Sequence, residues 1–153
     1  MTYSEQITSN HPLAHRYQKL IDTVLKNEGA RTTPFNTEIC IDLDQFEIDL
    51  NRGQDRDKTM DLMIGLTSKQ MLLVEAKLNV KSPNNLGKKE LVEKIRHTKE
   101  ILVEQELSIA KEKVFLFNDK VIGKARYYIS QLFQKNPNVK VYTVQEFKEN
   151  IFL

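Results

Sequence analysis

The chain has 153 residues, of which 40% are hydrophobic and 29% are charged. This composition is too apolar for an intrinsically disordered protein and too highly charged for a membrane-embedded bundle. Twenty-three basic and 21 acidic residues leave a net charge of only +2, well below that of a protein that coats nucleic acid, although one cationic face is compatible with this total. The single cysteine, Cys40, excludes an internal disulfide framework and a cysteine-rich zinc site.

Length and punctuation bear on domain organisation and location. Without long linkers or repeats, the sequence predicts one domain over residues 1–153, with residues 1–10 as a loosely ordered N-terminal segment. The first ten residues lack the basic start and apolar stretch of a signal peptide, and no apolar run approaches the length of a membrane span. We therefore expect a soluble, cytoplasmic protein with no membrane partner.

The first predicted element is a helix that begins near Pro12 and is ended by Asn27-Glu28-Gly29, with Gly29 just beyond its last turn. Its apolar residues recur at helical spacing and form one stripe: Leu13, Tyr17, Leu20, Ile21, Val24 and Leu25. Two alternating apolar patterns follow, at residues 39–43 and 46–50, with a phase shift of one residue between them. This shift predicts a strand interrupted by a bulge or tight turn near residues 44–45.

A polar loop is predicted over residues 51–58, followed by a hairpin whose two strands cover residues 60–66 and 71–78. The remaining predicted elements are a helix at 86–102, a strand at 113–117, a helix at 121–133 and a strand at 139–144. In this order the early strands form a meander and the later ones alternate with helices. The sequence therefore predicts an α/β domain with a mixed sheet flanked by helices.

The hairpin places three charged residues on one face. If its turn is centred on Ser68, Asp61 lies directly opposite Glu75, and directly opposite residues share a face with Cβ atoms about 4.5–5.5 Å apart. Lys77 follows Glu75 by two residues and so points to the same face. A slip of one residue would separate these groups, which makes the register a testable part of the hypothesis.

Two opposed carboxylates repel each other and destabilise a sheet unless one is protonated, a cation neutralises them, or they splay into water. Mg²⁺ fits the second possibility, because it prefers oxygen ligands, takes one or two carboxylates and keeps several waters. Such an ion can hold a phosphate oxygen and activate a water, and a neighbouring ammonium can orient that water or offset developing charge.

Asp61, a hydrophobic strand and the tripeptide Glu75-Ala76-Lys77 resemble the motif of the PD-(D/E)xK nuclease superfamily. The restriction-endonuclease-like core of that family, in the order helix, three strands, helix and strand, is similar to the order predicted here over residues 12–117. The resemblance implies that Asp61, Glu75 and the Ala76 carbonyl bind Mg²⁺ or Mn²⁺ and that Lys77 positions the attacking water. The implied reaction is hydrolysis of phosphodiester bonds in DNA, or less often RNA.

This sequence departs from the family pattern at several positions. Met60 stands where the family name has proline. Several members carry an acidic residue on the first helix, for which Asp22 and Glu28 are the candidates here. One branch has a glutamine and a tyrosine on the helix after the lysine; neither occurs at that spacing between residues 86 and 102. There the basic residues Lys94, Arg96 and His97 are the available substitutes.

Basic residues around this motif are candidates for contact with the phosphate backbone: Lys81, Arg52, Arg56, Lys94 and Arg96. The alternative is a solvated surface on which neighbouring acidic residues balance them, and this alternative is favoured for most of the second-helix lysines. By analogy with the family, a homodimer or a protein partner is also compatible with so short a chain.

Two other interpretations remain open. The chain could be a non-catalytic interaction module, such as an immunity-type protein, built on the same fold. It could also be an unrelated α/β protein with a fortuitous Glu-Ala-Lys, in which case Asp61 and Glu75 would not be neighbours.

Overall fold

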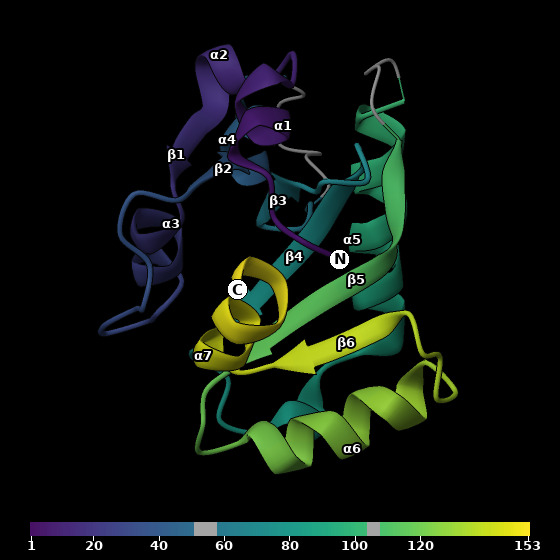
Figure 1. Cartoon of the computed structure of the whole chain (residues 1–153). Helices are drawn as coiled ribbons and strands as arrows, with labels where there is room; N and C mark the ends of the chain where they lie inside the picture. Colours follow the sequence, from purple (N-terminus) through teal and green to yellow (C-terminus); the bar gives the residue numbers. More distant parts are fainter. Residues whose placement is uncertain (51–57, 104–107) are drawn as a thin grey trace.

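The computed structural model describes residues 1–50, 58–103 and 108–153, which form a mixed six-stranded sheet with helices on both faces (Figure 1). Strand order in the sheet follows the chain, antiparallel from β1 to β4 and parallel from β4 to β6. The strands are β1 (Gln18–Leu20), β2 (Ile39–Asp42), β3 (Leu62–Gly65), β4 (Met71–Lys77), β5 (Ile109–Phe117) and β6 (Val139–Tyr142). The predicted mixed, helix-flanked sheet is thus confirmed.

Nine helical segments accompany the strands within the described residues. They are α1 (Glu5–Asn10), α2 (Ala14–Tyr17), α3 (Ile21–Asn27), α4 (Leu43–Asp49), the 3₁₀ turn η2 (Pro83–Asn85), α5 (Lys88–Ile101), α6 (Ile122–Leu132), α7 (Val144–Phe147) and the π-helical turn η3 (Lys148–Phe152). None of the helices in the described ranges is long and apolar enough to cross a membrane.

Each face of the central strands buries its own apolar cluster. Leu62 and Val74 pack with α3 and with the C-terminal turns α7 and η3, whereas Met63 and Leu73 pack with α4, α5 and α6. In Figure 1, α5 lies behind β4 and β5, and the C-terminal turns lie in front of them. A strand covered on both faces carries apolar residues at successive positions, which accounts for the continuous apolar run Met71–Val74.

The single helix predicted over residues 12–29 is wrong, because strand β1 divides it into α2 and α3. Tyr17 of α2 packs in the α5-side cluster, whereas Ile21 and Leu25 of α3 pack on the opposite side of the sheet. One continuous helix could not reach both clusters. The extended edge strand, paired with β2 through Lys19 and Cys40, carries the chain from one face to the other.

The strand predicted over residues 46–50 is also wrong, since this segment belongs to helix α4. Asp42 caps the helix through its side chain, which accepts a hydrogen bond from the Gln45 N–H (3.1 Å). Leu43 and Phe46 are buried at helical spacing, while Ile48 is 42% exposed. The alternation at residues 46–50 therefore consists of one buried residue of a short helix, Phe46, and two exposed residues, Ile48 and Leu50.

Residues 1–10, expected to be loosely ordered, contain helix α1 and several links to the sheet. The Ser4 N–H donates to Gly65 O (2.8 Å), and the Gly65 N–H donates to Thr8 Oγ1 (2.8 Å). A side chain at Gly65 would place its Cβ 2.5 Å from the Thr8 backbone nitrogen, so glycine permits this close approach. Tyr3 stacks on Phe152 with ring centroids 4.4 Å apart, which joins the two ends of the chain.

The second half of the chain follows the predicted order. The 60–66 and 71–78 hairpin appears as β3 and β4, and the two later helices appear as α5 and α6. Strand β5 begins four residues earlier than predicted, at Ile109. Strand β6 ends at Tyr142, two residues earlier than predicted, because Thr143 and Glu146 form a capping box that starts α7, a helix absent from the predicted elements.

Candidate functional site

The β3–β4 hairpin fixes the first pair of candidate site residues. Its ladder pairs Leu62 with Val74 and Met63 with Leu73, which is the predicted register and places Asp61 opposite Glu75. The Asp61 N–H donates to Val74 O (3.1 Å), so the pairing extends one residue beyond β3. The Ala76 N–H donates to Asp61 Oδ2 (2.7 Å), and this bond holds the Asp61 carboxylate beside β4.

Glu75 is the centre of the cluster and is only 1% exposed. Its Oε2 lies 3.2 Å from Lys77 Nζ on the same strand and also accepts a hydrogen bond from the ammonium of Lys94 on α5. Its other oxygen, Oε1, is buried and makes no hydrogen bond within the described residues. One carboxylate oxygen is therefore held by two ammonium groups, and the Asp61 carboxyl lies within hydrogen-bonding reach of Glu75.

Helix α5 presents Lys94 to the strands from its buried face. Leu91, Lys94 and Thr98 are buried at spacings of three and four residues and so lie along one side of the helix. Thr98 Oγ1 donates to Lys94 O (2.6 Å) and accepts from the Met60 N–H (2.9 Å), which ties this turn to the residue before Asp61. Lys94 was predicted to contact a phosphate backbone; the structure instead places it in the carboxylate cluster, as the apolar spacing around it could have indicated.

Glu28 at the end of α3 also lies within electrostatic range of the cluster. Gly29 ends the helix as predicted, with φ of 115°, and the Ala30 N–H donates to Leu25 O (3.0 Å), as in a Schellman motif. A Cβ at Gly29 would lie 2.3 Å from the Asn79 side chain, so this helix end packs closely against the residues that follow β4. Burial, and then the negative charge of Glu75, raise the pKa of Glu28.

The electrostatics of the cluster are dominated by its carboxylates. Burial, together with the charges of Glu75 and Glu28, raises the pKa of Asp61 to about 9, although the hydrogen bond from Ala76 opposes this. Burial alone would lower the pKa of Lys94, but the negative charges of Glu75 and Asp61 outweigh it and raise that pKa. A group of acids in this situation holds either a proton or a cation at neutral pH.

A hard divalent cation fits these residues. The unpartnered Glu75 Oε1 and the adjacent Asp61 carboxylate supply the oxygen ligands that Mg²⁺ and Mn²⁺ accept. Over the described ranges no three His, Cys, Asp or Glu side chains are grouped so that they could hold an ion by themselves. An ion here would complete its shell with water and a backbone oxygen, and the predicted role of the Ala76 carbonyl stays a prediction.

The other predicted residues fall in different places. Lys81 is exposed in the turn after β4, and Arg96 is exposed on α5 between Glu93 and Glu100, with which it forms surface ion pairs. Asp22 accepts from Thr33 and pairs with Lys26, away from the cluster. Arg52 and Arg56 lie outside the described residues.

Comparison of the chain with protein-family models, with curated proteins and with solved structures found no match.

Proposed function

We propose that this protein is a metal-dependent nuclease that hydrolyses phosphodiester bonds, with DNA as its principal substrate. The observation that carries the proposal is the opposition of Asp61 and Glu75 across the hairpin, with Lys77 beside them and Glu75 Oε1 unpartnered. The order α3, β2 to β4, α5 and β5 supports a restriction-endonuclease-like core, with α4 inserted between its first two strands.

In this proposal each side chain has a separate task. Asp61 and Glu75, with the Ala76 carbonyl, would hold Mg²⁺ or Mn²⁺, which when bound supplies Lewis-acid activation of a water and of the phosphate. Lys77, whose side chain is 16% exposed, reaches the solvent side of the cluster and orients the attacking water. Lys94 is more deeply buried and fixes the Glu75 carboxylate from α5. Glu28 adds negative charge that favours cation binding.

A non-catalytic interaction module is the second candidate, and one observation favours it. Lys94 and Lys77 both contact Glu75, so the carboxylate already has two positive partners. A site closed by its own ammonium groups needs no metal for charge balance. The two candidates therefore differ in whether a divalent cation enters the cluster and supports cleavage there.

Calorimetric titration with Mn²⁺ separates them, using the wild-type protein, Asp61→Asn and Asp49→Asn. Asparagine keeps an acceptor for the Ala76 N–H but removes the charge, and Asp49, at the exposed end of α4, is the matched control. Binding by the wild type and Asp49→Asn, but not by Asp61→Asn, together with Mn²⁺-dependent cleavage of DNA, is the expected result. Equal binding by all three proteins would contradict the metal site, and Mn²⁺ binding without cleavage of DNA or RNA would favour the interaction module.

A further inference from the structure

A hollow of about 900 Å³ lies at the carboxyl ends of β4 and β5. Residues 29–34 after α3, 78–81 after β4 and 117–121 after β5 line it, together with the start of α7. Two of its lining residues, Gly29 and Leu78, directly follow the cluster residues Glu28 and Lys77 in the chain. Ligands of open α/β sheets commonly bind in such crevices outside the carboxyl ends of the strands.

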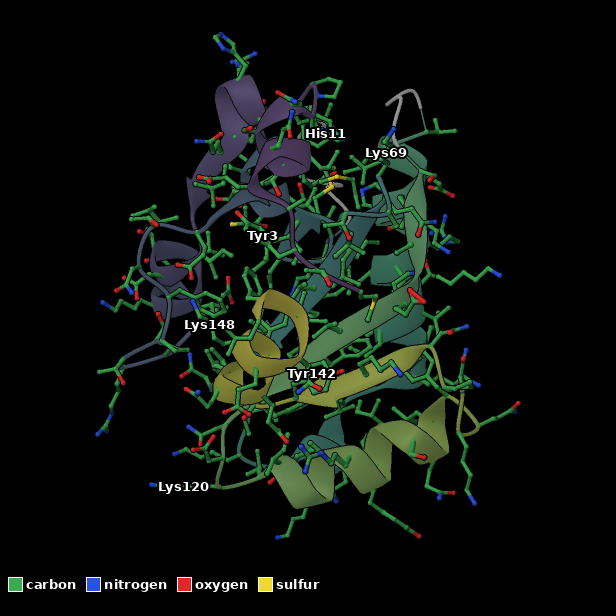
Figure 2. The ribbon with its side chains drawn as sticks, viewed as in Figure 1. Tyr3, His11, Lys69, Lys120, Tyr142 and Lys148 are labelled. Atoms are coloured by element: carbon green, nitrogen blue, oxygen red, sulfur yellow. The ribbon has the colours of Figure 1, made fainter. Side chains whose placement is uncertain are left out.

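Three cationic side chains from three separate loops line this hollow: Arg31, Lys81 and Lys120. All three residues are exposed, and their side chains form no ion pair or hydrogen bond among the residues that the structure describes. Figure 2 shows Lys120 projecting into solvent from the connection between β5 and α6. Asp119 is the one acidic side chain in the lining, so positive charge predominates there.

The first turn of α6 adds to this positive character. The helix has 11 residues, and its N-cap, Val121, has no side chain that can accept from the first backbone N–H groups. Val121 itself lines the hollow, and a Cβ at Gly123 in the same turn would meet nothing within 4 Å. Uncapped N–H groups and the helix dipole favour an anion.

We propose that this hollow binds the phosphate backbone of one unpaired nucleic-acid strand and leads it to the carboxylate cluster. Cationic side chains that form no ion pairs and an uncapped helix start are the features that contact phosphates without reading sequence. The hollow lies within the range of about 300–1,000 Å³ typical of sites that enclose one small molecule. A hollow of this size can take a short stretch of one strand and is too small to enclose a duplex.

The choice of a nucleic-acid strand as the ligand rests on the proposed function. The test therefore measures binding alone, without a metal ion and without cleavage. Anisotropy of a short fluorescein-labelled single-stranded DNA is measured in EDTA with the wild type and with Arg31→Ala/Lys81→Ala/Lys120→Ala. The matched control, Arg16→Ala/Lys99→Ala/Lys111→Ala, removes the same charges from exposed positions outside the hollow. Thermal unfolding of both triple variants verifies that they are folded.

We expect the hollow triple variant to bind the strand about tenfold or more weakly than the wild type at low salt. The slope of log K against log salt concentration should become shallower by about 2, because each lost phosphate contact on a single strand removes about 0.7 from it. The control triple should bind like the wild type. An equal loss in both triples, or none in either, would overturn the inference. If an unlabelled duplex competes as well as the unlabelled single strand, the preference for an unpaired strand is overturned. If the hollow binds a mononucleotide but not the oligonucleotide, the proposal that its ligand is a nucleic-acid strand is overturned.

The same variants separate this inference from the proposed function. If the hollow triple loses strand binding while the wild type cleaves nothing with Mn²⁺, the hollow is supported and the nuclease proposal fails. If the wild type cleaves DNA and the hollow triple both binds and cleaves equally well, the nuclease proposal stands and the hollow fails.

Discussion

Helix α5 carries two buried polar clusters, one turn apart, that differ in their balance of charge. Around Lys94, the carboxylates of Asp61, Glu75 and Glu28 outnumber the ammonium groups of Lys94 and Lys77. Around His97, the imidazole Nε2 lies 2.8 Å from Glu47 Oε2, and both side chains are almost fully buried.

The difference shows how one helix can both join elements and support a candidate site. The His97–Glu47 contact links α5 to α4, and Glu100 Oε2 on the exposed side of α5 lies 3.9 Å from the other ring nitrogen, Nδ1. The Lys94 cluster sets three acidic groups against two ammonium groups and raises the pKa of Asp61 to about 9, so Asp61 holds a proton at neutral pH unless a cation takes its place. The unpartnered oxygen, Glu75 Oε1, is a position that such a cation would satisfy. We therefore expect the His97 cluster to act on stability alone, and the Lys94 cluster to act on stability and chemistry.

The largest expected effect is the loss of cleavage activity in the Lys77→Met variant. In the proposed mechanism this ammonium orients the water and offsets developing charge, so its loss should lower kcat about 100- to 1,000-fold. Stability should fall less than in a Lys94 variant, because the Lys77 side chain is more exposed (16% against 10%) and Lys94 still pairs with Glu75. Arg96→Met, which removes a charge from the exposed side of α5, is the control and should cleave like the wild type. Cleavage kinetics and thermal unfolding measure both, and full activity in Lys77→Met would remove this residue from the mechanism.

Lys94→Met should be the most destabilising change in the cluster. Removing one partner of a buried ion pair costs about 3–5 kcal/mol. We expect a loss near the lower end of this range, because Lys77 still lies 3.2 Å from Glu75 Oε2 in this variant. Denaturant unfolding measures the loss. Mn²⁺ should raise Tm more in this variant than in the wild type, since the cation would replace the missing charge. An equal rise in both proteins would show that Lys94 and the metal do not compete for Glu75.

His97→Gln tests the other cluster. The lost contact with Glu47 should lower the free energy of unfolding by about 1–3 kcal/mol, the usual cost of leaving a buried polar group poorly satisfied. Mn²⁺ affinity should not change, because the contact is directed toward α4 rather than toward Glu75. Calorimetry and urea unfolding on one preparation give both values, and a changed Mn²⁺ affinity would mean that the two clusters act as one unit.

The smallest expected effect is on the pH dependence of stability, through the buried His11. Its Nδ1 accepts from the Leu13 N–H (3.1 Å), and burial lowers the pKa of His11 in the folded protein. The unfolded chain then binds the proton more readily, so this contribution to stability is present above about pH 6.5 and is lost as pH falls below that value.

His11→Asn keeps an acceptor for the Leu13 N–H but does not titrate, so its unfolding free energy should fall less steeply below this pH. His15→Asn, at an exposed site in α2, is the control and should follow the wild type. Urea unfolding across pH 5–8 provides the comparison; identical slopes for His11→Asn and the wild type would contradict the prediction.

Sequence patterns predicted the second half of the fold well and the first half poorly. Hairpin β3–β4 and helices α5 and α6 were found because each has one strong period and clear turn residues at its ends. The predictions for residues 14–49 were wrong because short segments there pack on different faces of the sheet. Their apolar residues nevertheless continue one helical spacing across α2, β1 and α3. The caps at Asp42 and Thr143 were local signals that could have located α4 and α7.

The sequence alone determined that Asp61, Glu75 and Lys77 share one face, because residue alternation and a short turn fix the register of a hairpin locally. The tertiary structure decided that Lys94 and Glu28 belong with them and that Arg31, Lys81 and Lys120 line one hollow. These residues come from helices and loops far apart in the chain. Their positions depend on how α3 and α5 pack against the sheet, which no local pattern encodes.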